Sequence, residues 1–181
     1  MSAIHGALVS VPETATILFS GGIDRPTSEE DAIVLQQLIF STQVQMEKTF
    51  CKRFPNHLYF CDRGTLDGAA YLTAELNEFC THMGTTLEEE YGRYDLVIHM
   101  QAALPGFGYK NTEIRIESPQ EAMRLDKKLE FIWGGHKNYH FVPNQSTFQE
   151  KLNHAVEILN RFYGVEEKSE ELEEYLEERT L

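Results

Sequence analysis

Short apolar runs alternate with stretches of helical periodicity along this chain, an order typical of α/β proteins whose helices connect parallel strands. Four runs predict strands, at Leu8–Val11, Leu58–Cys61, Leu96–Met100 and Tyr139–Val142. Their compact apolar character indicates burial within a sheet. The pattern therefore predicts an α/β fold built on a parallel sheet.

Helical signals occupy the first two intervals between these runs. A short helix is predicted over Thr14–Phe19, stopped by Gly21-Gly22. A longer helix is predicted from an N-cap at Ser28 towards Phe54-Pro55. At about 100° per residue, one apolar face of this helix is expected to pack on the sheet, formed by Leu35, Leu38, Ile39, Met46 and Phe50.

The later intervals predict further helices. One apolar stripe continues to about Cys80, and Met83–Tyr91 reads as a connector with a short helix. Ser118 with Glu121, and Ser146 with Gln149, have the spacing of capping boxes. The helices that they open are expected to end at Gly134-Gly135 and Gly164. The stripe that reaches Cys80 comprises Leu66, Ala69, Ala70, Thr73 and Leu76.

Length and charge limit the classes of protein that fit. The 181 residues suit one domain, predicted over 1–165, followed by an acidic tail over 166–181. The tail holds eight Glu against Lys168 and Arg179, which gives −6 of the total charge of −13. Such a charge opposes binding to nucleic acid or anionic membranes. Three cysteines without C-x-x-C spacing, and no apolar run of membrane-spanning length, predict a cytoplasmic protein.

The sharpest chemical signal is Asp62-Arg63-Gly64, directly after a predicted strand. A carboxylate at the carboxyl end of a buried strand can hold Mg²⁺ or accept a hydroxyl proton, and Arg63 offers a fork for a phosphate. Glu13 follows another strand in the same way and can act on a substrate hydroxyl. The alternatives are a surface ion pair at Asp62-Arg63 and a helix-dipole contact at Glu13.

Polar side chains form a stripe on the long helix. Gln36, Phe40, Gln43 and Glu47 are spaced by four, three and four residues, on the face opposite the expected packing face. Amides that flank an aromatic ring can bind a flat polar ligand such as a nucleobase, so we expect Gln36, Phe40 and Gln43 to contact substrate. A solvated helix face is the alternative.

Positive charge gathers in the predicted loop Pro105–Glu117 and the helix after it. Such a segment can close over transferred phosphates, with Arg115 and Arg124 as the principal cations, or it can simply balance neighbouring acids. Asn144, after the last strand, can contact a base edge or start a turn. The basic residues are Lys110, Arg115, Arg124, Lys127 and Lys128.

The seven histidines have no zinc-binding spacing, so no structural zinc is expected. His99, within an apolar strand, is interpreted as a hydrogen-bonded core residue.

With these pieces in order, the chain resembles the P-loop AAA-type domain of NadR-like ribosylnicotinamide kinases and the TRPL translocation defect protein family. The resemblance covers nearly all of residues 8–164 and is closer to the second branch. The matching stretches are Val11–Thr16, Phe60–Gly64 with Asp67–Tyr71, Arg93–Met100, Asn111–Asp126, Gly135-His136 and Val142–Asn144.

The resemblance implies a three-layer, nucleoside-kinase-like P-loop fold that binds ATP or GTP with Mg²⁺ for phosphoryl transfer or as a nucleotide switch. Asp62 would be the Walker-B-like, metal-binding carboxylate and Glu13 the acceptor-side carboxylate. Arg115 and Arg124 would be lid cations. The acceptor is expected to be small and nucleoside-like.

One departure from the family pattern changes this expectation. The sequence contains no G-x-x-x-x-G-K-[ST], the motif whose amides and Lys cradle phosphates. We therefore expect the central first strand and P-loop to be missing, and an upstream segment or protein partner to complete the sheet. Catalysis is expected to be impaired, and the alternative function is a non-enzymatic GTP-binding trafficking adaptor or pseudokinase-like module.

Overall fold

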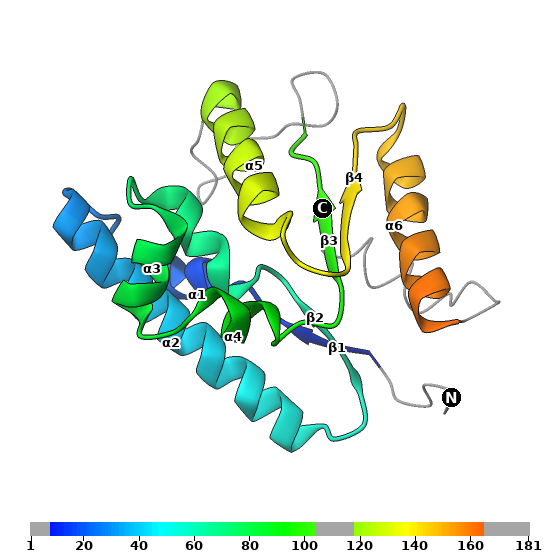
Figure 1. The fold of residues 1–181 in the computed structure, drawn as a ribbon, viewed down its shortest axis with the longest axis horizontal. Helices are drawn as coiled ribbons and strands as arrows, with labels where there is room; N and C mark the ends of the chain where they lie inside the picture. The colour runs from blue at the N-terminus through cyan, green and yellow to red at the C-terminus, as the bar shows by residue number, and fades with distance from the viewer. Residues whose placement is uncertain (1–7, 104–117, 165–181) are drawn as a thin grey trace. The chain divides into compact units, whose positions relative to one another are not determined.

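A computed structural model describes residues 8–103 and 118–164 of the chain. The chain divides into two compact units, between Tyr94 and Asp95 (Figure 1). Each unit has one parallel sheet of two strands, flanked by helices. The predicted α/β class and the four strands are confirmed, but the described strands form two sheets instead of one. The predicted boundary at residue 165 lies outside the described residues.

The sheet of the first unit joins β1 (Leu8–Val11) to β2 (Leu58–Cys61). The strands run in register from Leu8 opposite Leu58 to Val11 opposite Cys61. The amide of Asp62 extends the ladder by donating to the Val11 carbonyl over 2.9 Å. Because parallel strands share one carboxyl edge, the residues that follow Val11 and Cys61 emerge side by side.

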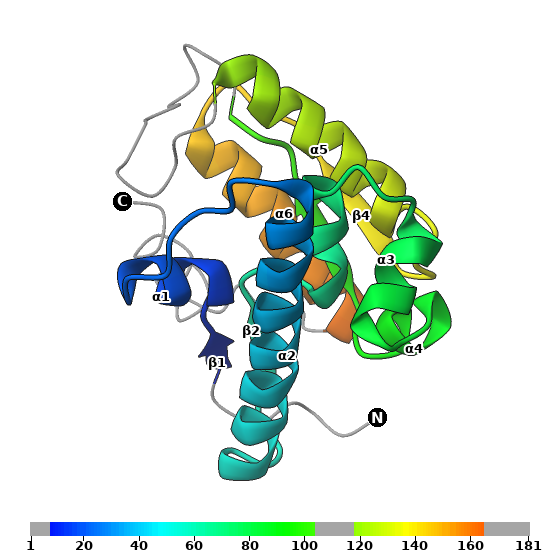
Figure 2. The ribbon, with the colours of Figure 1, turned by 90° about the vertical axis from the view of Figure 1, so that its left-hand side faces the viewer.

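Two helices connect these strands, α1 (Thr14–Ser20) and α2 (Glu29–Arg53). The Ser28 side chain accepts from the Asp31 amide, which confirms the predicted N-cap of α2. Figure 2 shows α2 as the long helix beside β1.

The face of α2 that packs inward differs from the prediction. Leu35 is buried as expected, but Leu38 is 40% exposed. Gln36, Gln43 and Glu47 are buried instead. The polar stripe is therefore the inner face of α2. Gln43 and Glu47 find hydrogen-bond and ion-pair partners there, which offset the cost of removing them from water.

After β2 the chain forms a 3₁₀ segment and two short helices, where one continuous helix was predicted to Cys80. These elements are η1 (Thr65–Tyr71), α3 (Leu76–Met83) and α4 (Leu87–Tyr91), the last within the predicted connector. The tight 3₁₀ turn brings Gly68 against α2, where a β-carbon would lie only 2.3 Å from the Gln36 Oε1 atom. Leu66, Leu72 and Phe79 form the centre of this core.

The second unit pairs β3 (Val97–Met100) with β4 (Tyr139–Val142). Figure 1 shows these strands between α5 (Pro119–Trp133) and α6 (Phe148–Tyr163). An apolar cluster joins this sheet to α6: Ala155 and Ile158 of α6 pack with Leu96, Ile98, Met100 and Val142.

Capping boxes open both helices of this unit. Ser118 and Glu121 cap α5 as predicted, with Pro119 at the first turn. At α6 the prediction is wrong by one residue, because Thr147 and Glu150 form the reciprocal pair. In the described part of the chain, no helix has the length and apolar character needed to cross a membrane.

Candidate functional site

Charged side chains gather where β1 and β2 end. Glu13 lies two residues after β1, and Asp62 and Arg63 directly follow β2. The Arg63 guanidinium lies 3.5 Å from the Glu13 carboxylate and 3.7 Å from that of Asp67. We call these four residues the strand-end cluster. The structure thus brings together Glu13, Asp62 and Arg63, which the sequence placed after separate strands, and adds Asp67.

Arg63 occupies an unusual backbone conformation in this cluster. Its φ of 80° lies in the left-handed region, which costs a non-glycine residue on the order of 1 kcal/mol or more. Its side chain is 38% exposed. Burial lowers the pKa of Arg63, but the charges of Asp67 and Glu13 outweigh it and raise the pKa overall. Arg63 is therefore a permanent cation held at the rim of the sheet.

The Gln43 side chain of α2 contacts residues that follow both strands. Its Oε1 atom accepts from the Thr14 hydroxyl over 2.5 Å, and its Nε2 atom donates to Glu47 over 2.9 Å. The same Nε2 lies 3.5 Å from the Arg63 carbonyl. Gln43 therefore connects the residue after Glu13 with the turn that carries Arg63. Both polar atoms of its side-chain amide form hydrogen bonds within the protein.

A buried ionic network supports the same turn. Arg93 pairs with Glu47, and its Nε lies 3.5 Å from the Glu90 carboxylate. The Tyr94 hydroxyl donates to Glu47 over 2.9 Å and accepts from the Thr65 amide over 2.9 Å. Burial and the charge of Glu47 raise the pKa of Tyr94 well above its usual value, so the phenol stays protonated. The start of η1 is thereby fixed.

Polar atoms also meet at the carboxyl ends of β3 and β4. The Asn144 amide donates to the Gln101 side chain over 2.8 Å, and Asn144 Nδ2 donates to the Ala102 carbonyl over 3.0 Å. Lys151 of α6 donates to the Gln101 carbonyl and, over 3.1 Å, to Asn144 Oδ1. Burial lowers the pKa of Lys151 overall, and the charge of Asp126 offsets only part of this effect. Lys151 thus fastens the two strand ends together.

A chain of hydrogen bonds lies on the face of this sheet that carries His99, toward α5. His99 Nδ1 lies 2.8 Å from the Tyr139 hydroxyl, and Nε2 lies 3.1 Å from Asp126 Oδ1. Asp126 Oδ1 also accepts from the Ala102 amide over 2.6 Å. Burial raises the pKa of Asp126, but the bonds from His99 and Ala102 outweigh it and lower the pKa overall. His99 is a hydrogen-bonded core residue, as predicted.

The remaining predicted site residues do not join these groups. Gln36 packs against η1, and the Phe40 ring meets Phe79 edge-on at 6.5 Å between centroids. Their predicted position opposite the packing face of α2 is wrong, and a role in substrate binding stays a prediction. Arg124 lies exposed on α5. Lys110 and Arg115 lie outside the described residues.

Asp67 and Lys151 are among the residues of these groups that the sequence analysis did not single out. Asp67 stands four residues after Arg63, a spacing that allows an ion pair in any helical turn. Lys151 stands within the apolar stripe of α6, beside Leu152 and four residues before Ala155. A lysine in that position is a signal for a buried amine with specific acceptors.

Among residues 8–103 and 118–164, no three His, Cys, Asp or Glu side chains are arranged to hold a metal ion. A magnesium ion commonly takes only one or two protein carboxylates and completes its shell with water and phosphate oxygens. The oxygens of the strand-end cluster fit that second arrangement.

Comparison with known proteins identifies the family. Residues 2–151 match the AAA domain family, which is more than four-fifths of the chain. No curated protein and no solved structure gives a significant match. The matched region contains both described sheets and the strand-end cluster. The chain therefore belongs to the AAA domain family, whose members are of the P-loop nucleotide-binding type.

Proposed function

We propose that this chain binds ATP or GTP with Mg²⁺ through the strand-end cluster, and that the complete site transfers a phosphoryl group to a small nucleoside-like acceptor. Asp62 would hold the metal, Glu13 would accept the hydroxyl proton of the acceptor, and Arg63 would contact a phosphate. Membership of the AAA domain family supports the nucleotide-binding part of this proposal.

The observation that carries the proposal is the shared edge of β1 and β2. The register between Val11 and Cys61 puts Glu13 and Asp62 at one edge, with the Arg63 guanidinium 3.5 Å from Glu13. Ligands of open α/β sheets bind beyond the carboxyl ends of the strands. The planar guanidinium of Arg63 has the donor geometry that phosphate oxygens accept from.

The phosphate cradle is the part that these residues do not supply. The sequence lacks G-x-x-x-x-G-K-[ST], and so it lacks the backbone amides and the Lys with which that motif holds phosphates. Preorganised donors of this kind supply much of the stabilisation in phosphoryl transfer. We therefore expect binding to depend strongly on Mg²⁺ and Arg63, and turnover by this chain to be slow.

Calorimetric titration with ATP and with GTP, each with and without Mg²⁺, tests the proposal. Asp62→Asn should abolish the Mg²⁺ dependence, and Arg63→Ala should weaken binding about tenfold. Asp24→Asn, in an exposed loop of the same unit, is the matched charge control. Unchanged affinity in both site variants would exclude the strand-end cluster. A chain extended by native upstream sequence shows whether further residues strengthen the site.

The missing phosphate motif favours a second function, a non-enzymatic GTP-binding adaptor or pseudokinase-like module. Such a protein would bind nucleotide without hydrolysing or transferring the terminal phosphate. Incubation of the chain with radiolabelled ATP or GTP separates the two. Release or transfer of label that Asp62→Asn abolishes supports an enzyme, whereas binding without turnover supports the adaptor.

A further inference from the structure

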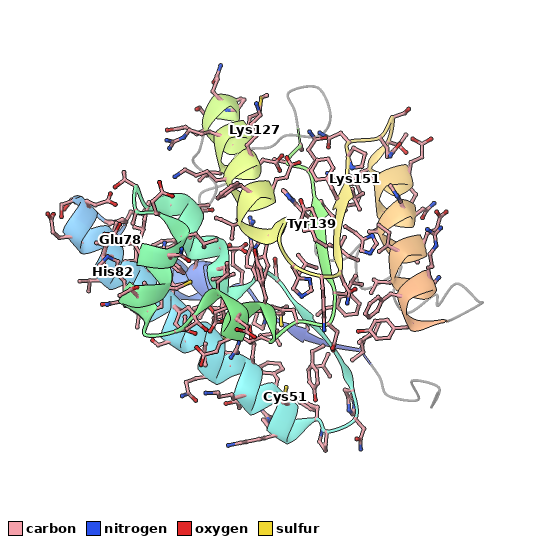
Figure 3. All side chains as sticks on the ribbon, viewed as in Figure 1. Cys51, Glu78, His82, Lys127, Tyr139 and Lys151 are labelled. Carbon is pink, nitrogen blue, oxygen red and sulfur yellow. The ribbon has the colours of Figure 1, made fainter. Side chains whose placement is uncertain are left out.

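A small cavity opens beside α5 in the second unit. It has a volume of about 120 Å³ and lies next to the face of β4 that carries Phe141. A cavity of roughly 150 Å³ is large enough for benzene, so this one suits a group of about five or six heavy atoms. Lys127, which Figure 3 shows on α5, is one of the residues that line the cavity. The lining residues are Gln101, Ala102, Met123, Asp126, Lys127, Glu130 and Phe141.

Asp126 is the buried polar group of this cavity. It is 9% exposed, and both hydrogen bonds that it accepts within the described residues fall on Oδ1. Asp126 lines the cavity, and its second oxygen, Oδ2, takes neither of these two bonds. A carboxylate fixed by two donors on one oxygen presents the other in a defined direction.

The cavity wall combines negative charge with apolar surface. Two carboxylates, Asp126 and Glu130, stand against one exposed amine, Lys127. Lys151 lies within electrostatic range of Asp126, but it donates to Gln101 and Asn144 and does not line the cavity. Met123 and Phe141 supply thioether and aromatic surface, which binds the alkyl part and attracts the charge of an organic cation.

We infer that this cavity binds a primary ammonium group on a short aliphatic chain, with Asp126 Oδ2 accepting from the ammonium and Phe141 and Met123 contacting the alkyl part. Glu130, at the exposed rim, adds attraction from a distance. The ligand is a free small amine or the side chain of a lysine in a partner, since both carry the same head group. This inference does not depend on nucleotide binding.

Titration of the chain with n-butylammonium, followed by NMR, tests the inference. The Ala102 amide donates to Asp126 and should shift on binding, with an affinity in about the millimolar range. Neutral n-butanol should produce no saturable shift at the same concentrations. Equal shifts with the alcohol, or no shift with the amine, would overturn the proposal.

Variants of the two carboxylates give the second readout. Asp126→Asn keeps an oxygen for the Ala102 amide but removes the charge, and should weaken binding at least about tenfold. Glu130→Gln should weaken it about threefold, because that group is exposed. Glu157→Gln, exposed on α6, should leave it unchanged. Full affinity in both cavity variants, with unfolding as in the parent chain, would contradict the assignment.

The two sources of the ammonium group are separated with Nα-acetyl-lysine methylamide. Binding weaker than that of n-butylammonium identifies a free amine as the ligand class. Equal or tighter binding identifies lysine side chains of a partner.

Discussion

At the scale of single residues, burial decides which side chains of this protein can react. Burial and the nearby charge of Glu47 raise the pKa of the Cys61 thiol to about 12. Cys80 is almost fully buried, and burial together with the charge of Glu90 raises its pKa. Cys51 is exposed on α2, as Figure 3 shows. Only the thiolate form of cysteine attacks an electrophile.

We therefore expect one cysteine thiol of the native protein, that of Cys51, to react rapidly. At pH 8 roughly one Cys61 side chain in ten thousand is thiolate, so Ellman's reagent should modify Cys51 first and the other two only slowly. Cys51→Ser should remove the fast phase, and urea should expose all three thiols. Any fast thiol that remains in native Cys51→Ser would contradict the raised pKa values of Cys61 and Cys80.

At the scale of elements, α2 shows what the amino-acid pattern could and could not predict. Its position and its Ser28 cap followed from local signals that act within a few residues. Its buried face could not be predicted in this way. Gln43 and Glu47 are stabilised by Thr14 and Tyr94, which lie far from them in the sequence. Apolar periodicity counts such polar side chains as solvent-facing.

The site residues also divide into those that local signals predict and those that depend on partners distant in the sequence. Glu13, Asp62 and Arg63 were predictable because each follows a strand that ends at a recognisable turn. The buried arrangement at Asn144 was not, since its partner Lys151 belongs to the next helix and interrupts an apolar stripe. Tertiary hydrogen bonds between separate elements leave no periodic trace in the sequence.

Removal of the Glu47 charge should destabilise the first unit. Glu47→Gln leaves Arg93, which is 21% exposed, without its main counter-charge, and should lower the free energy of unfolding by about 2–4 kcal/mol. Urea unfolding followed by circular dichroism measures this change. Glu88→Gln, exposed on α4, is the control and should have an effect below about 0.5 kcal/mol. Equal stability of the two variants would show that the network contributes little.

The shifted cap of α6 makes a second prediction at this scale. Thr147 accepts from the Glu150 amide over 3.1 Å, whereas Ser146 is outside the helix. Thr147→Ala should cost about 1 kcal/mol and Ser146→Ala only a few tenths. Thermal or urea unfolding of the two variants decides between them. The opposite ranking would restore the cap predicted from sequence.

At the scale of the whole molecule, the dominant property is the charge of −13. Like charges repel more strongly in the compact state than in the expanded one, and salt screens that repulsion. The urea midpoint should therefore rise as NaCl is increased from about 0.05 M to 0.5 M, where the Debye length falls well below about 10 Å. A midpoint that falls with salt would show that ion pairs such as Glu47–Arg93 outweigh the general repulsion.

The backbone of Arg63 sets two kinds of selection against each other. At φ 80°, glycine would relieve strain of about 1 kcal/mol, so variants chosen for heat resistance alone should accumulate glycine there. Variants chosen for binding phosphate should keep arginine and its strain. A laboratory evolution experiment run under each regime would thus record, in one codon, whether the chain is being maintained as a scaffold or as a binding site.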